Sequence, residues 1–132
     1  MSCAFASHTP VSFGAYDVLA KTPLDSAGTV TLLCTQVRPG DTVTLELSPG
    51  AGGSYTPRRL SGRGDTALRY NLYLDASRTR IWGNGTGSTG RYGPVAPRSG
   101  VPLVLTIYGR VPPHQPVRSG TFSDAIVLTV NF

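Results

Sequence analysis

The last segment of the chain, residues 120–132, constrains the fold most, because its apolar and polar residues alternate more cleanly than anywhere else. The apolar residues that share one face of the predicted strand are Ile126, Leu128, Val130 and Phe132. A strand this apolar must be covered on its core face, and its two edges must be paired or blunted. The given sequence has no later segment to pair with it. We therefore expect another chain to complete the sheet, and strand exchange to be the function.

The composition predicts an all-β chain. Among 132 residues, 16 Gly and 11 Pro are too frequent for a helical bundle and too aperiodic for collagen. The length fits one domain, residues 1–132, with a sizeable core. No stretch approaches transmembrane length, so we expect no membrane insertion.

Six segments are predicted as strands, with turn-forming residues between them. They are residues 11–16, 29–34, 42–48, 67–74, 101–108 and the terminal segment. A weak strand is predicted over residues 80–82, followed by a long loop over residues 83–100. No segment has the pattern of a helix. The fold class is therefore an antiparallel β-sandwich of six to seven strands.

The two cysteines, Cys3 and Cys34, lie at opposite ends of the first hairpin-sized segment. In a secreted all-β domain we expect a disulfide there, which would contribute about 3–4 kcal/mol. The alternative is a pair of buried thiols in a cytosolic protein. The disulfide is favoured, because no metal-ligand spacing or CxxC motif gives these cysteines another role, and it predicts an oxidising location.

The net charge of +5 is unevenly distributed. Eight of the twelve basic residues fall between residues 58 and 98, against two acidic ones: Arg58, Arg59, Arg63, Arg69, Arg78, Arg80, Arg91 and Arg98, with Asp65 and Asp75. Such a region can attract an anionic surface or polymer, but a solvated, aggregation-resistant face is the favoured interpretation. Nucleic acid is not expected as a partner, because no aromatic platform accompanies the arginines.

Nothing in the sequence asks for catalysis or a cofactor. His8 and His114 are the only histidines, and no group of His, Cys, Asp or Glu has metal-ligand spacing. No G-x-S-x-G nucleophile motif is present, and the seven carboxylates form no evident pair. We therefore expect no metal, no cofactor and no enzymatic activity.

Trp82 precedes the long loop and has two interpretations. An exposed Trp82 could contact a host surface or a neighbouring subunit, together with Arg58, Arg59 and Arg63. The favoured alternative is that Trp82 anchors the weak strand against the core, since large aromatic residues are usually buried.

Several motifs occur in a specific order along the chain. Cys3, residues 13–17 (Phe-Gly-Ala-Tyr-Asp) and Cys34 open it; residues 69–75 (Arg-Tyr-Asn-Leu-Tyr-Leu-Asp) and 82–85 (Trp-Gly-Asn-Gly) lie in the middle. Residues 108–112 (Tyr-Gly-Arg-Val-Pro), 120–124 (Gly-Thr-Phe-Ser-Asp) and 128–132 (Leu-Thr-Val-Asn-Phe) close it. From Cys3 to Phe132 the chain resembles the spore coat protein U domain family, which includes the subunits of archaic chaperone–usher pili.

The resemblance implies an incomplete immunoglobulin-like sandwich that lacks its final strand, with a hydrophobic groove beside the last one. A periplasmic chaperone would fill this groove first, and the N-terminal extension of a neighbouring pilus subunit would then replace it. The implied location is the periplasm in transit, then the cell surface, as a fibre or spore coat. An apolar groove beside an unpaired strand edge can bind a complementary strand tightly.

The period-2 pattern predicts which residues line that groove, on the inward sides of several strands. They are Phe13, Val30, Leu32, Val43, Leu45, Leu103, Leu105, Ile107, Ile126, Leu128, Val130 and Phe132.

The chain departs from the family at its beginning, where only Met1 and Ser2 precede Cys3. Polymerising subunits carry an alternating donor segment there. The donor segment was removed, or the chain is the pilin-type domain of a two-domain tip adhesin, or it is an adhesive or spore-surface domain that completes its own fold. The third explanation leads to the alternative function, a self-sufficient surface-binding module that uses the Arg-rich region. A strand-swapped homo-oligomer is a further open arrangement.

Overall fold

The computed structural model describes residues 1–64, 66–118 and 120–132, and these residues contain eight β-strands and no helix. The strands are β1 (Ser2–Thr9), β2 (Leu24–Thr35), β3 (Val43–Leu47), β4 (Arg58–Ser61), β5 (Ala67–Tyr73), β6 (Tyr92–Val95), β7 (Leu103–Val111) and β8 (Leu128–Asn131).

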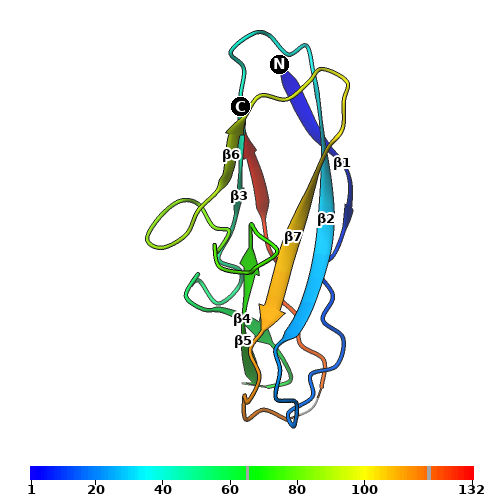
Figure 1. The fold of residues 1–132 in the computed structure, drawn as a ribbon. Helices are drawn as coiled ribbons and strands as arrows, with labels where there is room; N and C mark the ends of the chain where they lie inside the picture. Colours follow the sequence, from blue (N-terminus) through cyan, green and yellow to red (C-terminus); the bar gives the residue numbers. More distant parts are fainter. Residues whose placement is uncertain (65, 119) are drawn as a thin grey trace.

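The strands form two antiparallel sheets, which confirms the predicted all-β sandwich (Figure 1). One sheet has five strands in the order β1-β2-β7-β5-β4, and the other has three in the order β6-β3-β8. Both ends of the chain lie at the upper end of the molecule in Figure 1. None of the described residues forms a helix long and apolar enough to cross a membrane.

The core lies between the sheets and follows from the period-2 alternation of the central strands. On β2, Val30, Leu32 and Cys34 are buried, whereas the residues between them are half-buried. On β3, residues 43, 45 and 47 are buried in the same way. The strands predicted over residues 29–34, 42–48, 67–74 and 101–108 are confirmed as parts of β2, β3, β5 and β7.

The first predicted strand is wrong. Residues 11–16 are not a strand; they connect β1 to β2, and Gly14 within them has a φ of 69°. The first strand is β1, which was not predicted because Ser2–Thr9 exposes nearly all of its residues and so lacks a clear apolar face. Pro10 ends it, since proline has no N–H to donate to β2.

Two further strands were missed, and two segments are shorter than predicted. β4 contains two arginines, and β6 contains Gly93 and Pro94, so neither has the composition of a strand. β6 divides the loop predicted over residues 83–100. The weak strand at residues 80–82 is reduced to isolated bridges of Ile81 to Tyr73 and of Trp82 to Gly90. Within the terminal segment only β8 is a strand.

Trp82 and Arg58 are both inside the molecule, so the predicted surface contact by these two residues is wrong. Trp82 is 1% exposed, and its indole Nε1 donates to the Leu45 carbonyl at 2.9 Å. Arg58 is fully buried even though its neighbour Arg59 is exposed, because successive residues of β4 face opposite sides of the sheet. The other interpretation of Trp82, a core anchor, is confirmed.

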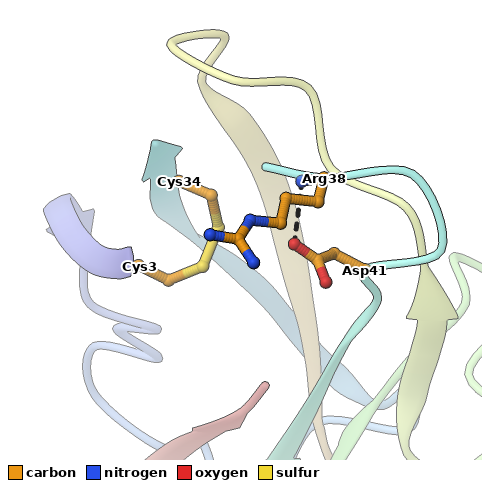
Figure 2. The surroundings of a disulfide bond; sticks show 4 residues. All are labelled: Cys3, Cys34, Arg38 and Asp41. Atoms are coloured by element: carbon orange, nitrogen blue, oxygen red, sulfur yellow. Dashed lines mark hydrogen bonds between the residues drawn. A yellow bond between two sulfur atoms is a disulfide. The ribbon is translucent and has the colours of Figure 1, made fainter. Parts of the chain in front are cut away.

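Cys3 and Cys34 form a disulfide, as predicted. They are directly opposite each other in the β1–β2 ladder, with their Cα atoms 4.1 Å apart. Figure 2 shows this bond at the ends of the two strands, next to the turn that contains Arg38 and Asp41. In that turn the Arg38 backbone N–H donates to Asp41 Oδ2 at 2.8 Å. The disulfide therefore holds the edge strand β1 to β2 at the end of the sandwich where the chain begins.

Candidate binding groove

β8 is at the edge of its sheet, and among the described residues it has a hydrogen-bonded neighbour strand on one side only, β3. The Ser48 backbone N–H donates to the Val127 carbonyl at 2.9 Å, so the backbone of Val127 faces β3. Backbone groups of successive residues in a strand point to opposite edges. The N–H and C=O groups of Leu128 and Val130 therefore face the open edge of β8.

A groove of about 920 Å³ lies next to this open edge and enters the space between the two sheets. One wall, residues 8–16, is the end of β1 and the start of the connection to β2; the other, residues 120–128, is the chain leading into β8 and the first residue of that strand. The floor consists of side chains from both sheets: Val30, Leu47, Leu60, Leu68, Tyr70, Leu72, Ile107 and Val111. Its shape and apolar lining fit an extended segment with side chains that enter between the sheets.

The first wall lies close to the inner face of β2 and β7 because two glycines make room for it. A Cβ atom on Gly28 would be 2.5 Å from the Thr9 carbonyl oxygen, and one on Gly109 would be 2.6 Å from the ring of Phe13. The Ser26 hydroxyl donates to the Ser12 carbonyl at 2.6 Å, which fixes the wall to β2. Side chains at either glycine would push this wall into the groove.

Asp124 fixes the second wall to the rest of the molecule. Its Oδ1 accepts from the backbone N–H of Ala51 at 2.9 Å, and its Oδ2 accepts from the hydroxyl of Tyr70 at 2.5 Å. One residue earlier, Ser123 exchanges two backbone hydrogen bonds with Ser61, at 2.7 and 2.9 Å. The wall is thus joined to β4, to β5 and to the turn that follows β3.

Tyr70 remains a hydrogen-bond donor to Asp124 over a wide pH range. Burial raises the pKa of the Tyr70 hydroxyl well above its usual value, and the neighbouring Asp124 carboxylate raises it further. The phenolic proton is therefore retained where an exposed tyrosine would begin to ionise. Tyr70 also contacts Phe13 of the opposite wall, with ring centroids 6.0 Å apart in an edge-to-face arrangement.

The structure brings part of the predicted residue set into the groove. Five of the twelve residues line it: Phe13, Val30, Ile107, Ile126 and Leu128. The others lie elsewhere: Leu32, Val43, Leu45 and Leu105 are buried in the core, Leu103 and Val130 are half-buried against it, and Phe132 is 62% exposed. Whether the lining residues receive a strand remains a prediction.

Sequence reasoning missed much of the floor of the groove and also Phe122. Leu60 belongs to the unpredicted strand β4, and Leu68, Tyr70 and Leu72 belong to β5, which the sequence did place as a strand. The alternation of this last segment predicts Leu68, Tyr70 and Leu72 on one face, but the predicted groove did not include that face. Phe122 lies in the predicted terminal strand with the same alternation as Ile126, but the polar Asp124 stands between them, and Phe122 was not included in the predicted groove.

The remaining candidate residues form no second apolar site. Arg59 and Arg63 are exposed, as surface contacts would require, and their role in binding stays a prediction. Within the described part of the chain, no three His, Cys, Asp or Glu residues are grouped so that they could hold a metal ion.

Comparison with known proteins gives consistent matches. A sequence model of the Spore Coat Protein U domain matches residues 1–129. Protein U of Myxococcus xanthus is 33% identical over an alignment 132 residues long. The alignment covers 92% of this chain and 71% of Protein U.

The fold also matches a solved structure. One chain of the crystal structure of the CsuC–CsuE chaperone–tip adhesion subunit pre-assembly complex, from archaic chaperone–usher Csu pili of Acinetobacter baumannii, superposes with a TM-score of 0.64 at 20% identity. The match covers 99% of this chain and 40% of that one, so this chain spans less than half of it. The likeness confirms the predicted pilin-like, immunoglobulin-like fold.

Proposed function

The chain belongs to the Spore Coat Protein U domain family, and from that premise we propose that it is a single-domain structural subunit of a secreted bacterial surface fibre, or the pilin-type domain of the tip protein of such a fibre. It acts by accepting an extended segment of another chain in its groove. The expected partners are a periplasmic chaperone and neighbouring subunits. The chain passes through the periplasm and is then displayed at the cell surface. Its role is assembly and not catalysis.

The observation that carries this proposal is the coincidence of the groove with the open edge of β8. An added strand can pair through the N–H and C=O groups of Leu128 and Val130, while its alternate side chains fill the apolar space beside Ile126 and Phe13. Main-chain hydrogen bonds supply pairing, and burial of apolar side chains supplies most of the free energy. The solved complex of a related fold, a chaperone with a tip adhesion subunit, supports a chaperone as one such partner.

The proposal is tested by thermal melting of the purified chain with a short synthetic peptide in which Ile or Val alternates with Thr. A ligand that binds only the folded state stabilises it by about 2.7 kcal/mol at about 100 times its Kd. For a chain of this size we expect Tm to rise by about 10 °C. The control peptide has the same composition in an order that breaks the alternation, and it should leave Tm unchanged.

A stable, monomeric chain whose Tm does not respond to the alternating peptide would overturn the proposal. It would instead favour a self-sufficient module that recognises surfaces through exposed residues such as Arg59 and Arg63.

A further inference from the structure

A second recess shares part of its lining with the groove, and Phe122 lies where the two spaces meet. Phe122 lines both spaces, together with Gly120 and Thr121. The second recess has a volume of about 470 Å³, and its lining is different in character. Among the residues that the structure describes, its other lining residues are Arg63, Gly64, Thr66 and Arg118. An apolar groove is thus continuous with a recess lined by two arginines.

Phe122 is held at this boundary by close packing. A Cβ atom on Gly62 would be 2.5 Å from Cε1 of the Phe122 ring, so the ring lies directly against the backbone of Gly62. The backbone hydrogen bonds between Ser61 and Ser123 hold the adjoining residues together. The position of Phe122 at the junction of the two spaces is therefore fixed by the backbone of β4 and the residues that follow it.

The two arginines come from separate segments. Arg63 follows β4, and Arg118 precedes the wall formed by residues 120–128. Both side chains are exposed, so their charges interact with a ligand mainly at the rim of the groove. Such rim charges favour a partner of opposite sign, and they act more on association rate and selectivity than on affinity.

We propose that the segment accepted by this groove carries an acidic residue directly beyond its apolar run, at the end that meets Phe122. There its carboxylate lies in the recess between Arg63 and Arg118, while the apolar residues remain on the other side of the Phe122 ring. This inference rests on the proposed function, because it specifies the chemistry of the strand that the groove accepts. The two arginines would thus select among strands that otherwise fit the apolar groove equally well.

The test uses the whole chain and peptides with one alternating apolar run followed by Glu, Gln or Lys. A second set carries the same three residues before the run, since only one end of the peptide can meet Phe122. In one set only, the Glu peptide should bind about two- to five-fold more tightly than the Gln peptide, and the Lys peptide more weakly than both. The difference should shrink at high salt, because exposed charges are screened.

Two single variants and their combination locate the effect, and a fourth variant provides the control. Arg63→Ala and Arg118→Ala should each reduce the preference for Glu over Gln, and the double variant should abolish it. Arg98→Ala removes an exposed arginine that lines neither space, so the preference should be unchanged. Melting of each variant without peptide checks that the fold is retained.

The outcomes separate this inference from the proposed function. If all six peptides bind with equal affinity, the groove accepts strands, but the inference that it prefers a strand with an acidic residue is wrong. A preference for Glu that persists in the double variant also contradicts it. If no peptide binds, the proposed function fails, and the inference fails with it.

Discussion

Arg58 is the residue whose environment departs most from its usual one. Its fully buried guanidinium donates to the Ser48 carbonyl at 2.8 and 3.1 Å, to Asn71 Oδ1 at 3.0 Å and to the Trp82 carbonyl at 2.6 Å. It also lies 5.0 Å from the centre of the Tyr55 ring. Burial lowers the pKa of Arg58, because a charged group loses hydration inside a protein. These contacts join β4 to Asn71 of β5, to Ser48 after β3 and to Trp82. Arg58 therefore holds the core together and is not part of a surface site.

Replacing Arg58 should therefore destabilise the fold, unlike replacing its neighbour. Arg58→Ala leaves the acceptors at Ser48, Asn71 and Trp82 without their donor, and we expect a loss of about 2–4 kcal/mol in the free energy of unfolding. The matched control is Arg59→Ala on the exposed side of the same strand, with an expected change within about 0.5 kcal/mol. Urea denaturation measures both. Equal effects would show that the buried contacts of Arg58 do not stabilise the fold.

Tyr70 gives a prediction about pH. The folded-state pKa of Tyr70 is raised above that of the unfolded chain, so above about pH 10 the folded protein holds a proton that the unfolded chain releases. The stability from this difference is complete below about pH 10 and is lost as the pH rises further. In Tyr70→Phe the free energy of unfolding should be lower by about 1–2 kcal/mol at neutral pH, because Asp124 loses a donor, and should fall less steeply at alkaline pH. Identical alkaline slopes would contradict the raised pKa.

At the scale of elements, the two faces of the terminal segment provide a direct comparison. Leu128 lines the groove, whereas the adjacent Val127 is 65% exposed on the opposite face. Leu128→Asp places a charge in the apolar groove and should weaken binding of the alternating peptide about tenfold or more. Val127→Asp adds the same charge on the other face and should leave the affinity nearly unchanged.

Fluorescence titration with labelled peptide measures both affinities, and near-ultraviolet circular dichroism of each variant checks the fold. If Leu128→Asp does not fold, Leu128→Thr is the second variant and should weaken binding by a smaller factor. Equal affinity for Leu128→Asp and Val127→Asp would show that this face of the segment is not in the binding site.

The sequence predicts strands well where both alternation and burial are strong, as in β2, β3, β5 and β7. It fails for β1, which is exposed on nearly every residue, and for β4, where a buried arginine occupies an inward position. In the segment over residues 11–16, Phe13 faces inward as predicted, but the segment connects β1 to β2 within one sheet and does not itself pair as a strand. The alternation of apolar and polar residues indicates which side of the chain a side chain faces, but it does not indicate whether the backbone pairs with a neighbouring strand.

The groove was predicted as a feature, but its residues were only partly predicted. Leu32 and Leu45 have the same alternation as Val30, yet they are buried in the core and do not line the groove. Position along the strands decides between core and groove, because the paired residues Leu47 and Leu128 line the groove whereas the next inward pair, Leu45 and Val130, does not. Which residues share a level of the sandwich depends on the order and register of the strands. The order is set by contacts between distant parts of the chain, so a one-dimensional pattern does not contain it.

At the scale of the whole molecule, the disulfide restrains the start of the chain. It closes a loop with a sequence separation of 31, and its first strand, β1, contributes little to the core. Loss of such a cross-link is expected to cost about 3–4 kcal/mol. Denaturant unfolding of the protein with and without reductant should show this loss. The Cys3→Ser, Cys34→Ser double variant should resemble the reduced protein and be insensitive to reductant, and an unchanged midpoint on reduction would contradict this estimate.

The central claim is that the open edge of β8 accepts a strand, and amide hydrogen exchange with and without the alternating peptide tests it most directly. The amide of Thr129 faces β3 by alternation from Val127 and should be protected in both states. The amides of Leu128 and Val130 face the open edge and should gain protection only when the peptide is bound. Peptide binding that leaves the exchange of these two amides unchanged would contradict the claim that the added strand pairs with β8.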